Sequence, residues 1–251
     1  DLGGWENKEN IDYFIEYSDF VITNLKRIGV KYFITFNEPL VYVFSAYILG
    51  VFPPFKKISD IKDVSRALEI LENMKKASEE VCKIIKENEA KGIYVENFSG
   101  FNIPFRLKFL LGENLIKFVL STIPKTDGIG INYYGISINS HNRKFKPSIS
   151  LFKKILELTS KKTNEVFITE NGINTEDELE RIKFIKKHLS FVIRNKEKYR
   201  IRGYFIWSLM DNYEWDIGYK AKFGIMTRDL EPKDSYYEIK NLFSILKSKK
   251  L

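Results

Sequence analysis

Helical and strand-like segments alternate along most of this chain. From Asn10 to Ile28, apolar side chains recur at every third or fourth position, which predicts a helix that Gly29 ends. The next segment, Val30–Phe36, consists mainly of β-branched and aromatic residues and predicts a buried strand. Strands that alternate with helices in this way favour a parallel sheet whose strands are joined by crossover helices.

The same patterns recur to the end of the chain. Strands are expected at about residues 31–36, 92–96, 128–132, 165–169 and 203–208. Helices are expected at about residues 10–28, 60–88, 104–120, 148–158, 176–194 and 235–247. A capping box from Thr175 to Glu178 is expected to begin the helix at 176–194. No repeat, linker or low-complexity segment interrupts this order, so we expect one domain over residues 1–251.

The length and the number of predicted strands point to a barrel that is not closed. A chain of 251 residues suits a (β/α)₈ barrel, which typically has about 250. About five strands, however, are fewer than the eight that close such a barrel. We therefore expect an α/β fold, an incomplete (β/α)₈ TIM barrel with about five βα units. Its two open sheet edges and uncovered apolar face would favour association with other chains.

The composition argues against nucleic-acid binding and against a membrane span. The 41 basic and 33 acidic side chains leave a net charge of +8, but the two signs are interspersed and form no basic stripe. The longest uncharged run, Pro39–Phe55, contains Gly50 and three prolines. A span needs about 20 mainly apolar residues, so we expect this run to form an aromatic-rich pocket lining or core.

The residues that bind metals or form disulfides are few. One cysteine, Cys82, and two histidines do not make up a His/Cys zinc site. A single thiol also excludes an intramolecular disulfide and fits a reducing cytoplasm, where we expect the protein to reside. Because the sequence begins at Asp1 and not at Met, we expect a processed product, a fragment or a trimmed chain.

Two carboxylates stand at the carboxyl ends of predicted strands. Glu38 and Glu170 follow the strands expected at 31–36 and 165–169. In a parallel barrel these ends face the active site. Most glycoside hydrolases use a pair of carboxylates as catalytic residues. Each also has a structural interpretation, because Glu38 precedes a proline that could begin a helix and Glu170 precedes an Asn-Gly turn.

Aromatic and polar side chains follow two further strands. The segment Trp207–Trp215 places two tryptophans, two acidic residues and an asparagine in one loop. Aromatic faces can stack on a sugar ring while Asp, Glu and Asn bind its hydroxyl groups; a core Trp207 beside a solvated acidic loop is the alternative. Tyr133 and Tyr134 follow Asn132, where a phenol could donate a hydrogen bond to a carboxylate or belong to the core.

Four of these motifs, taken in order, resemble glycoside hydrolase family 1. They are TFNEP (Thr35–Pro39), NYY (Asn132–Tyr134), ITENG (Ile168–Gly172) and WSLMDNYEW (Trp207–Trp215), followed by KFG (Lys222–Gly224). The resemblance runs from the first residues, DLGGW, to the end of the chain. It is to the carboxyl-terminal part of β-glucosidases and β-galactosidases, the archaeal enzymes in particular. Each motif alone has limited specificity, whereas four in the family's order are very specific.

The resemblance implies a role for each of these residues. Glu38 would be the general acid/base and Glu170 the nucleophile of a retaining, two-step mechanism, with carboxyl groups about 5–5.5 Å apart. Tyr134 would hydrogen-bond the nucleophile, and Trp207 would form the platform under the sugar. The full set that would bind the sugar is Asn37, Asn132, Tyr134, Trp207, Glu214, Trp215 and Phe223. No metal or organic cofactor would be required.

Three positions bear on the substrate that the resemblance implies. The branch of the family that acts on 6-phosphorylated glycosides has a serine in place of Glu214, and a lysine and a tyrosine just downstream. Here those positions are Glu214, Ala221 and Phe223. Because a carboxylate repels a phosphate group, the expected substrate is an unphosphorylated β-linked glucoside or galactoside.

The resemblance does not include the family's first three strands. Those strands carry a glutamine, an arginine and a histidine that contact the sugar or the nucleophile, and no residue here matches them. We therefore expect activity to depend on an amino-terminal half supplied by a complementing chain or by an uncut precursor, or on self-association. The alternative is a non-catalytic sugar-binding remnant of a split or truncated glycosidase. Between two motifs, Gly135–Ser148 is expected to be a brief polar loop.

Overall fold

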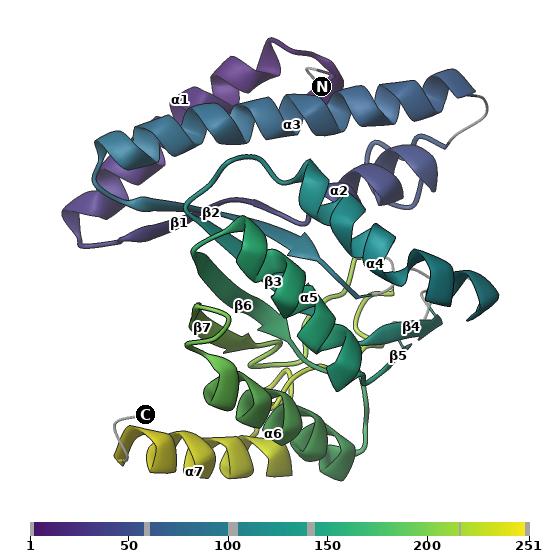
Figure 1. The fold of residues 1–251 in the computed structure, drawn as a ribbon, viewed down its shortest axis with the longest axis vertical. Coiled ribbons are helices and arrows are strands. Elements are labelled where there is room, and N and C mark those ends of the chain that lie inside the picture. The colour runs from purple at the N-terminus through teal and green to yellow at the C-terminus, as the bar shows by residue number, and fades with distance from the viewer. Residues whose placement is uncertain (1–2, 58–60, 100–104, 140–143, 216, 249–251) are drawn as a thin grey trace. The chain divides into compact units, whose positions relative to one another are not determined.

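The computed structural model describes residues 3–57, 61–99, 105–139, 144–215 and 217–248 (Figure 1). The chain forms two compact units. The first comprises Asp1–Asn97, Glu113–Gly130 and Lys161–Glu165, and the second comprises Phe98–Gly112, Ile131–Ser160 and Val166–Leu251.

The elements in chain order are η1 (Gly4–Glu6), α1 (Asn10–Arg27), β1 (Tyr32–Asn37), α2 (Pro39–Val43), η2 (Phe44–Ile48), α3 (Ile61–Glu87), β2 (Lys91–Asn97), α4 (Phe105–Thr122), β3 (Gly128–Tyr133), β4 (Ile136–Asn139), β5 (Lys144–Lys146), α5 (Ile149–Lys162), β6 (Glu165–Asn171), α6 (Glu178–Asn195), β7 (Ile201–Ile206) and α7 (Asp234–Ser248).

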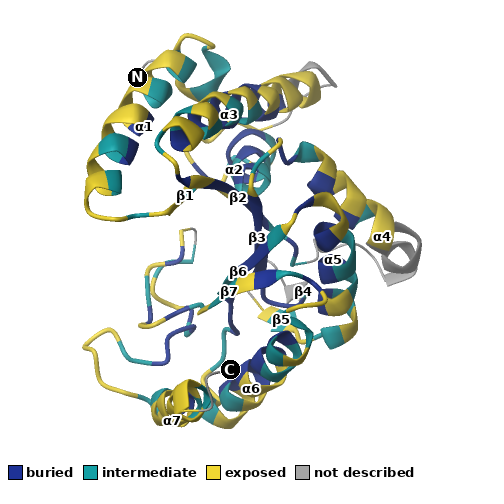
Figure 2. Cartoon of the chain, turned by 60° about the vertical axis from the view of Figure 1, so that its left-hand side comes forward, coloured by how far each residue is buried: buried dark blue, intermediate teal, exposed yellow. Residues whose placement is uncertain are grey.

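The five predicted strands are confirmed and belong to one sheet. Their order is β1-β2-β3-β6-β7, and the pairs β1–β2 and β6–β7 are parallel. All residues of β3 are buried, and Figure 2 shows this strand in dark blue. A strand that is apolar on both faces is typical of parallel sheets covered by helices. The expected α/β architecture with about five βα units is therefore confirmed.

The segment Gly135–Ser148, expected to be a loop, contains a two-stranded antiparallel ribbon. Strands β4 and β5 pair with Ile136 opposite Lys146 and Ser137 opposite Phe145. These strands have four and three residues and carry several polar side chains. They are too short for an alternation of apolar and polar residues to be recognised, so the expectation of a loop was wrong.

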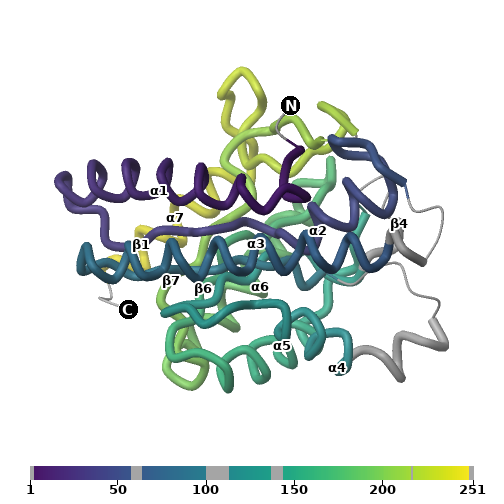
Figure 3. The backbone as a smooth tube through the Cα atoms, turned by 90° about the horizontal axis from the view of Figure 1, so that it is seen from above, coloured from purple at the N-terminus to yellow at the C-terminus, as the bar shows by residue number. Residues whose placement is uncertain are grey.

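In the first unit, helix α1 lies along helix α3 (Figures 1 and 3). Helix α1 ends as predicted at Gly29, which adopts φ 89°. The Gly29 N–H donates to Lys26 O (2.9 Å) and the Val30 N–H donates to Leu25 O (3.2 Å), two bonds of a Schellman motif. Only glycine reaches this backbone conformation without steric strain, and it satisfies two carbonyls of the last helical turn.

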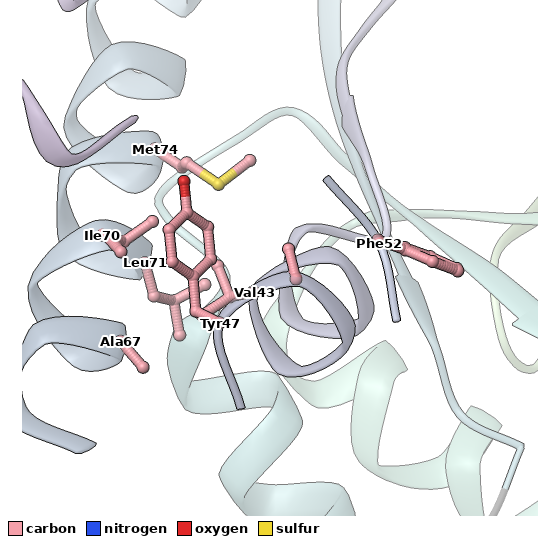
Figure 4. Close-up of a cluster of buried hydrophobic side chains, with 8 residues drawn as sticks. Val43, Tyr47, Phe52, Ala67, Ile70, Leu71 and Met74 are labelled. Atoms are coloured by element: carbon pink, nitrogen blue, oxygen red, sulfur yellow. The ribbon is translucent and has the colours of Figure 1, made fainter. Parts of the chain in front are cut away.

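Part of the uncharged run Pro39–Phe55 forms core, whereas Leu49, Val51 and Phe55 are exposed. Val43 and Tyr47 pack against Ile70 and Met74 of α3, as Figure 4 shows. This cluster is buried, which confirms that part of the prediction. No described helix has the length and apolar character of a membrane span.

In the second unit, the start of α6 differs from the predicted capping box. The Asp177 Oδ1 atom accepts hydrogen bonds from the N–H groups of Leu179 (2.9 Å) and Glu180 (3.1 Å). Asp177 is therefore the N-cap. Thr175, two positions before this N-cap, instead donates from Oγ1 to the Glu180 side chain (2.6 Å). Asp and Thr are both good N-caps, so the sequence pattern does not decide which of the two begins the helix. The path of the preceding loop decides it.

Candidate active site

Glu38 follows strand β1 and begins helix α2, with Pro39 at the first helical position. Its backbone has φ 54° and ψ 47°, the left-handed region that non-glycine residues rarely adopt. The Glu38 N–H donates to Val95 O (2.9 Å), and its Oε1 atom accepts a hydrogen bond from Asn97 Nδ2 (2.9 Å). The unusual backbone is thus tied to strand β2 at both the main chain and the side chain. Such outliers are concentrated at functional sites.

A β-bulge precedes Glu38. Ile34 pairs with Ile93 and Phe36 with Tyr94, so Thr35 is an extra residue in β1. Thr35 is buried, and its hydroxyl lies 2.7 Å from Ser78 Oγ of α3. A bulge changes the direction in which the following side chains point. It therefore sets the orientation of the TFNEP motif.

Glu96 is a third carboxyl group near Glu38, and the sequence analysis assigned it no role. It is fully buried at the end of β2, and its Oε1 atom accepts a hydrogen bond from the Leu40 N–H (3.3 Å). Burial, and secondarily the charge of Glu38, raise the pKa of Glu96 well above its ordinary value of 4.5. One signal could have identified it: an acidic residue that closes the otherwise apolar run Ile93–Val95.

Glu170 lies in the second unit, inside strand β6 and not after it as expected. Ile168 pairs with Tyr204 and Asn171 with Ile206, so Thr169 and Glu170 occupy a bulge. Next to the bulge, Asn171 Nδ2 donates to Tyr133 O (2.6 Å) and Asn171 Oδ1 accepts from the Tyr204 hydroxyl (2.7 Å). Both predicted catalytic carboxylates thus stand beside irregularities of their strands.

Tyr134 donates a hydrogen bond from its hydroxyl to Glu170 Oε2, as the resemblance implied. The Tyr134 ring is buried between Phe145, whose ring is stacked on it at 5.5 Å between centroids, and Phe223, whose ring meets it edge-on at 5.4 Å. The Tyr134 N–H donates to Ser99 Oγ (2.8 Å). A phenol that donates to a carboxylate stabilises its ionised form.

The loop after β7 links Trp207 to Glu214. Trp207 Nε1 and Asn212 Nδ2 both donate to Glu214 Oε1, at 3.2 and 2.8 Å. Trp207 packs against the cluster of Tyr134, Ala221 and Phe223. The second unit therefore brings together Glu170, Tyr134, Trp207, Glu214 and Phe223, which the sequence analysis selected from four separate segments.

The main chain at Gly172 lies in close contact with the main chain at Trp207 and positions that residue. A Cβ atom at Gly172 would lie 1.8 Å from the Trp207 carbonyl oxygen, so any side chain there would collide with the backbone. The Trp207 N–H donates to Asn171 O (3.0 Å), and the Trp207–Ser208 peptide bond is cis. The glycine of ITENG is therefore required by packing.

The other predicted sugar-binding residues differ in exposure. Asn37 and Trp215 are exposed. Asn132 is fully buried, and its Oδ1 atom accepts a hydrogen bond from Thr169 Oγ1 (2.7 Å) of the bulge in β6. In this structure Asn132 supports the strand that carries Glu170.

Charged side chains that the sequence analysis did not select surround Phe223. Arg181, Asp211 and Lys233 contact the main chain of Lys222–Gly224. Their signal in the sequence was weak, because single charged residues on helices and in loops are common. In the part of the chain that the structure describes, no group of three or more His, Cys, Asp or Glu side chains could hold a metal ion.

Comparisons with known proteins indicate the family of the chain. The model of glycosyl hydrolase family 1 matches residues 1–102 and 125–247. Beta-glucosidase A of Thermotoga maritima is 27% identical over an alignment of 317 residues, gaps included, and the alignment covers 96% of this chain and 69% of that protein. A 6-phospho-beta-galactosidase of Clostridium acetobutylicum is 25% identical over 329 residues, covering 93% and 68%.

Solved structures of family 1 enzymes are also similar to this chain. The beta-glucosidase of Thermotoga maritima in complex with castanospermine superposes with a TM-score of 0.79 at 25% identity, covering 96% of this chain and 69% of that one. The same enzyme in complex with galacto-hydroximolactam gives a TM-score of 0.79 at 26% identity. With the order of motifs, the fold and the family model in agreement, the chain belongs to glycosyl hydrolase family 1, a family of retaining β-glycosidases.

Proposed function

We propose that this chain carries the catalytic residues of a retaining β-glycosidase, with Glu170 as nucleophile and Glu38 as general acid/base. The hydrogen bond from Tyr134 to Glu170 is the observation that best supports this assignment. It favours the ionised form of that carboxyl group and fixes its orientation, as a nucleophile requires. The hydrogen bond from Asn97 to Glu38 orients the other carboxyl group.

The reaction proceeds in two displacements. A Glu170 carboxylate oxygen attacks the anomeric carbon while the bond to the aglycone oxygen breaks and Glu38 donates its proton to that oxygen. The product is a glycosyl ester of Glu170. Glu38, now a carboxylate, then removes a proton from water, which attacks the anomeric carbon and releases Glu170 and the sugar with retained configuration.

The substrate is an unphosphorylated β-glucoside or β-galactoside. Relatives of this chain include both beta-glucosidases and a 6-phospho-beta-galactosidase, so similarity alone does not choose between them. Glu214 favours the unphosphorylated substrate, because its carboxylate accepts hydrogen bonds from Trp207 and Asn212 and would repel a phosphate group. Exchange for serine should remove that repulsion. We expect Glu214→Ser to raise the ratio of 6-phosphoglucoside to glucoside bound.

Turnover requires barrel elements beyond those of this chain, supplied by an amino-terminal part of the barrel, either on a complementing chain or on an uncut precursor. Ile34 on β1 and Phe205 on β7 are each more than half exposed, and these strands stand at the two ends of the sheet order. Exposed apolar side chains on unpaired edge strands favour pairing with a further chain. If turnover instead rises with the concentration of this chain alone, self-association takes the place of the complementing chain.

The test is hydrolysis of aryl β-glucoside and β-galactoside by the purified chain, alone and with an amino-terminal segment of a family 1 barrel. Glu170→Gln should abolish all turnover, whereas Glu165→Gln in the same strand should not. An activated 2-deoxy-2-fluoro glucoside should add one sugar mass to Glu170. Sugar binding without turnover or adduct under both conditions would favour the non-catalytic remnant and contradict the proposal.

A further inference from the structure

The segment Lys222–Gly224 is held by charged side chains, of which Arg181 and Asp211 are buried and Lys233 is partly exposed. Arg181 of α6 is 1% exposed, and its Nη1 atom donates to the carbonyls of Lys222 (2.9 Å) and Phe223 (3.1 Å). The same guanidinium donates to Ile173 O (3.0 Å) and to Thr175 O, just beyond strand β6. A rigid fork of five N–H donors is suited to join two backbone segments in this way.

An ion pair between buried Asp211 and partly exposed Lys233 holds the next residue of the segment. Asp211 Oδ1 accepts the Gly224 N–H (2.9 Å), and Lys233 Nζ donates to Gly224 O (2.9 Å) and to both carboxylate oxygens of Asp211 (3.0 Å each). A Cβ atom on Gly224 would lie 2.2 Å from the Asp211 nitrogen. The main chain on both sides of Phe223 is therefore fixed by charge-assisted hydrogen bonds, which are stronger than those between neutral groups.

Phe223 connects this arrangement to the nucleophile. Its ring meets the Tyr134 ring edge-on, and the Tyr134 hydroxyl donates to Glu170. We propose that Arg181, Asp211 and Lys233, called here the clamp, are positioning residues for the nucleophile: they fix Phe223 against Tyr134 and so keep the Tyr134 hydroxyl on Glu170. This inference deepens the proposed function, since it rests on Glu170 being the nucleophile.

Other charged groups adjoin the clamp. Glu178 pairs with the Arg181 Nε atom (3.0 Å), and Lys222 Nζ lies 3.9 Å from Asp211 Oδ2. Glu214 adjoins the cluster through Trp207. A variant that changes the clamp can therefore alter the field at Glu170 directly. The experiment must separate that effect from one transmitted through Tyr134.

The experiment measures the pH midpoint at which the Glu170 carboxyl ionises, by NMR of the whole chain labelled with ¹³C at the glutamate carboxyl carbon. Glu170→Gln identifies the resonance. Arg181→Lys keeps the charge but cannot reach all the carbonyls, and Asp211→Asn keeps the acceptor for Gly224 but not the charge facing Lys233. Each should raise the midpoint by about half or more of the shift that Tyr134→Phe produces. In the Tyr134→Phe background, neither should add a further shift.

The matched control is Arg194→Lys, an exposed arginine on the same helix that donates to Ser190 O (3.1 Å); it should leave the midpoint unchanged. Circular dichroism selects the folded variants, and the two clamp variants come from different elements, so that either can carry the test. An unchanged midpoint in a folded clamp variant, or an equal shift without the Tyr134 hydroxyl, overturns the inference. The readout needs no turnover, so a chain that shows the Tyr134-dependent shift but stays inactive even with the amino-terminal segment added contradicts the proposed function and supports the clamp.

Discussion

The hydroxyl of Tyr134, which directly follows strand β3, donates a hydrogen bond to Oε2 of Glu170 in strand β6, 36 positions later in the chain. This bond favours the carboxylate over the carboxylic acid. We therefore expect Tyr134→Phe to raise the pH midpoint of Glu170 ionisation by about one unit, measured by NMR of the labelled carboxyl carbon. Tyr133→Phe is the matched control, because the Tyr133 hydroxyl donates to Ser148 O (2.7 Å) and not to Glu170. Equal midpoints in wild type and Tyr134→Phe would contradict the assignment.

Gly172→Ala should destabilise the chain strongly. The new methyl group would lie 1.8 Å from the Trp207 carbonyl oxygen, so strands β6 and β7 would have to move apart. We expect a loss of about 3 kcal/mol or more in the free energy of unfolding, measured by urea denaturation. Gly203→Ala in β7 is the control, because its methyl group would meet only ring atoms, at 3.1 and 3.2 Å, which can shift. Similar losses in both variants would show that the close approach at Gly172 is not what matters.

Glu96 should make the chain less stable as the pH rises. Burial raises its pKa in the folded state above the ordinary 4.5, so between these two values the folded chain holds a proton that the unfolded chain has lost. Stability from this group is present below pH 4.5 and is lost as the pH rises through the folded-state pKa. Glu96→Gln carries no ionisable group, and we expect its melting temperature to exceed that of wild type by more at pH 8 than at pH 5. Glu72→Gln, on the exposed side of α3, should show no such difference.

His188 should have the opposite dependence at acid pH. It is fully buried among Phe184, Tyr133 and Phe152, and burial lowers its pKa from 6.5 to about 4. The unfolded chain therefore binds a proton that the folded chain excludes as the pH falls from 6.5 towards 4. That difference removes about 3 kcal/mol of stability. His188→Leu should lose less stability than wild type between pH 7 and pH 4.5 in urea titrations; parallel curves would contradict the assigned cause.

Much of the fold follows from the sequence because it depends on local periodicity. Helices repeat every 3.6 residues and strands every two, so the five strands of the sheet could be predicted to within a few positions. The helix end at Gly29 was equally predictable, since few other residues tolerate its φ of 89°. Glu38 and Glu170 could be selected from the sequence as candidate catalytic residues because each lies near the carboxyl end of a predicted strand.

The tertiary structure decided what no local pattern contains. The bulges at Thr35 and at Thr169–Glu170 arise from strand pairing, and they orient the residues that follow. The protonation of Glu96 depends on burial, and the clamp around Phe223 joins a helix to loops far apart in the chain. The sequence by itself determined the order of elements and the chemical groups at the strand ends, because these depend on neighbouring residues. Only the folded chain decided where those groups point and how they ionise, because hydrogen bonds and exclusion of water come from residues distant in sequence.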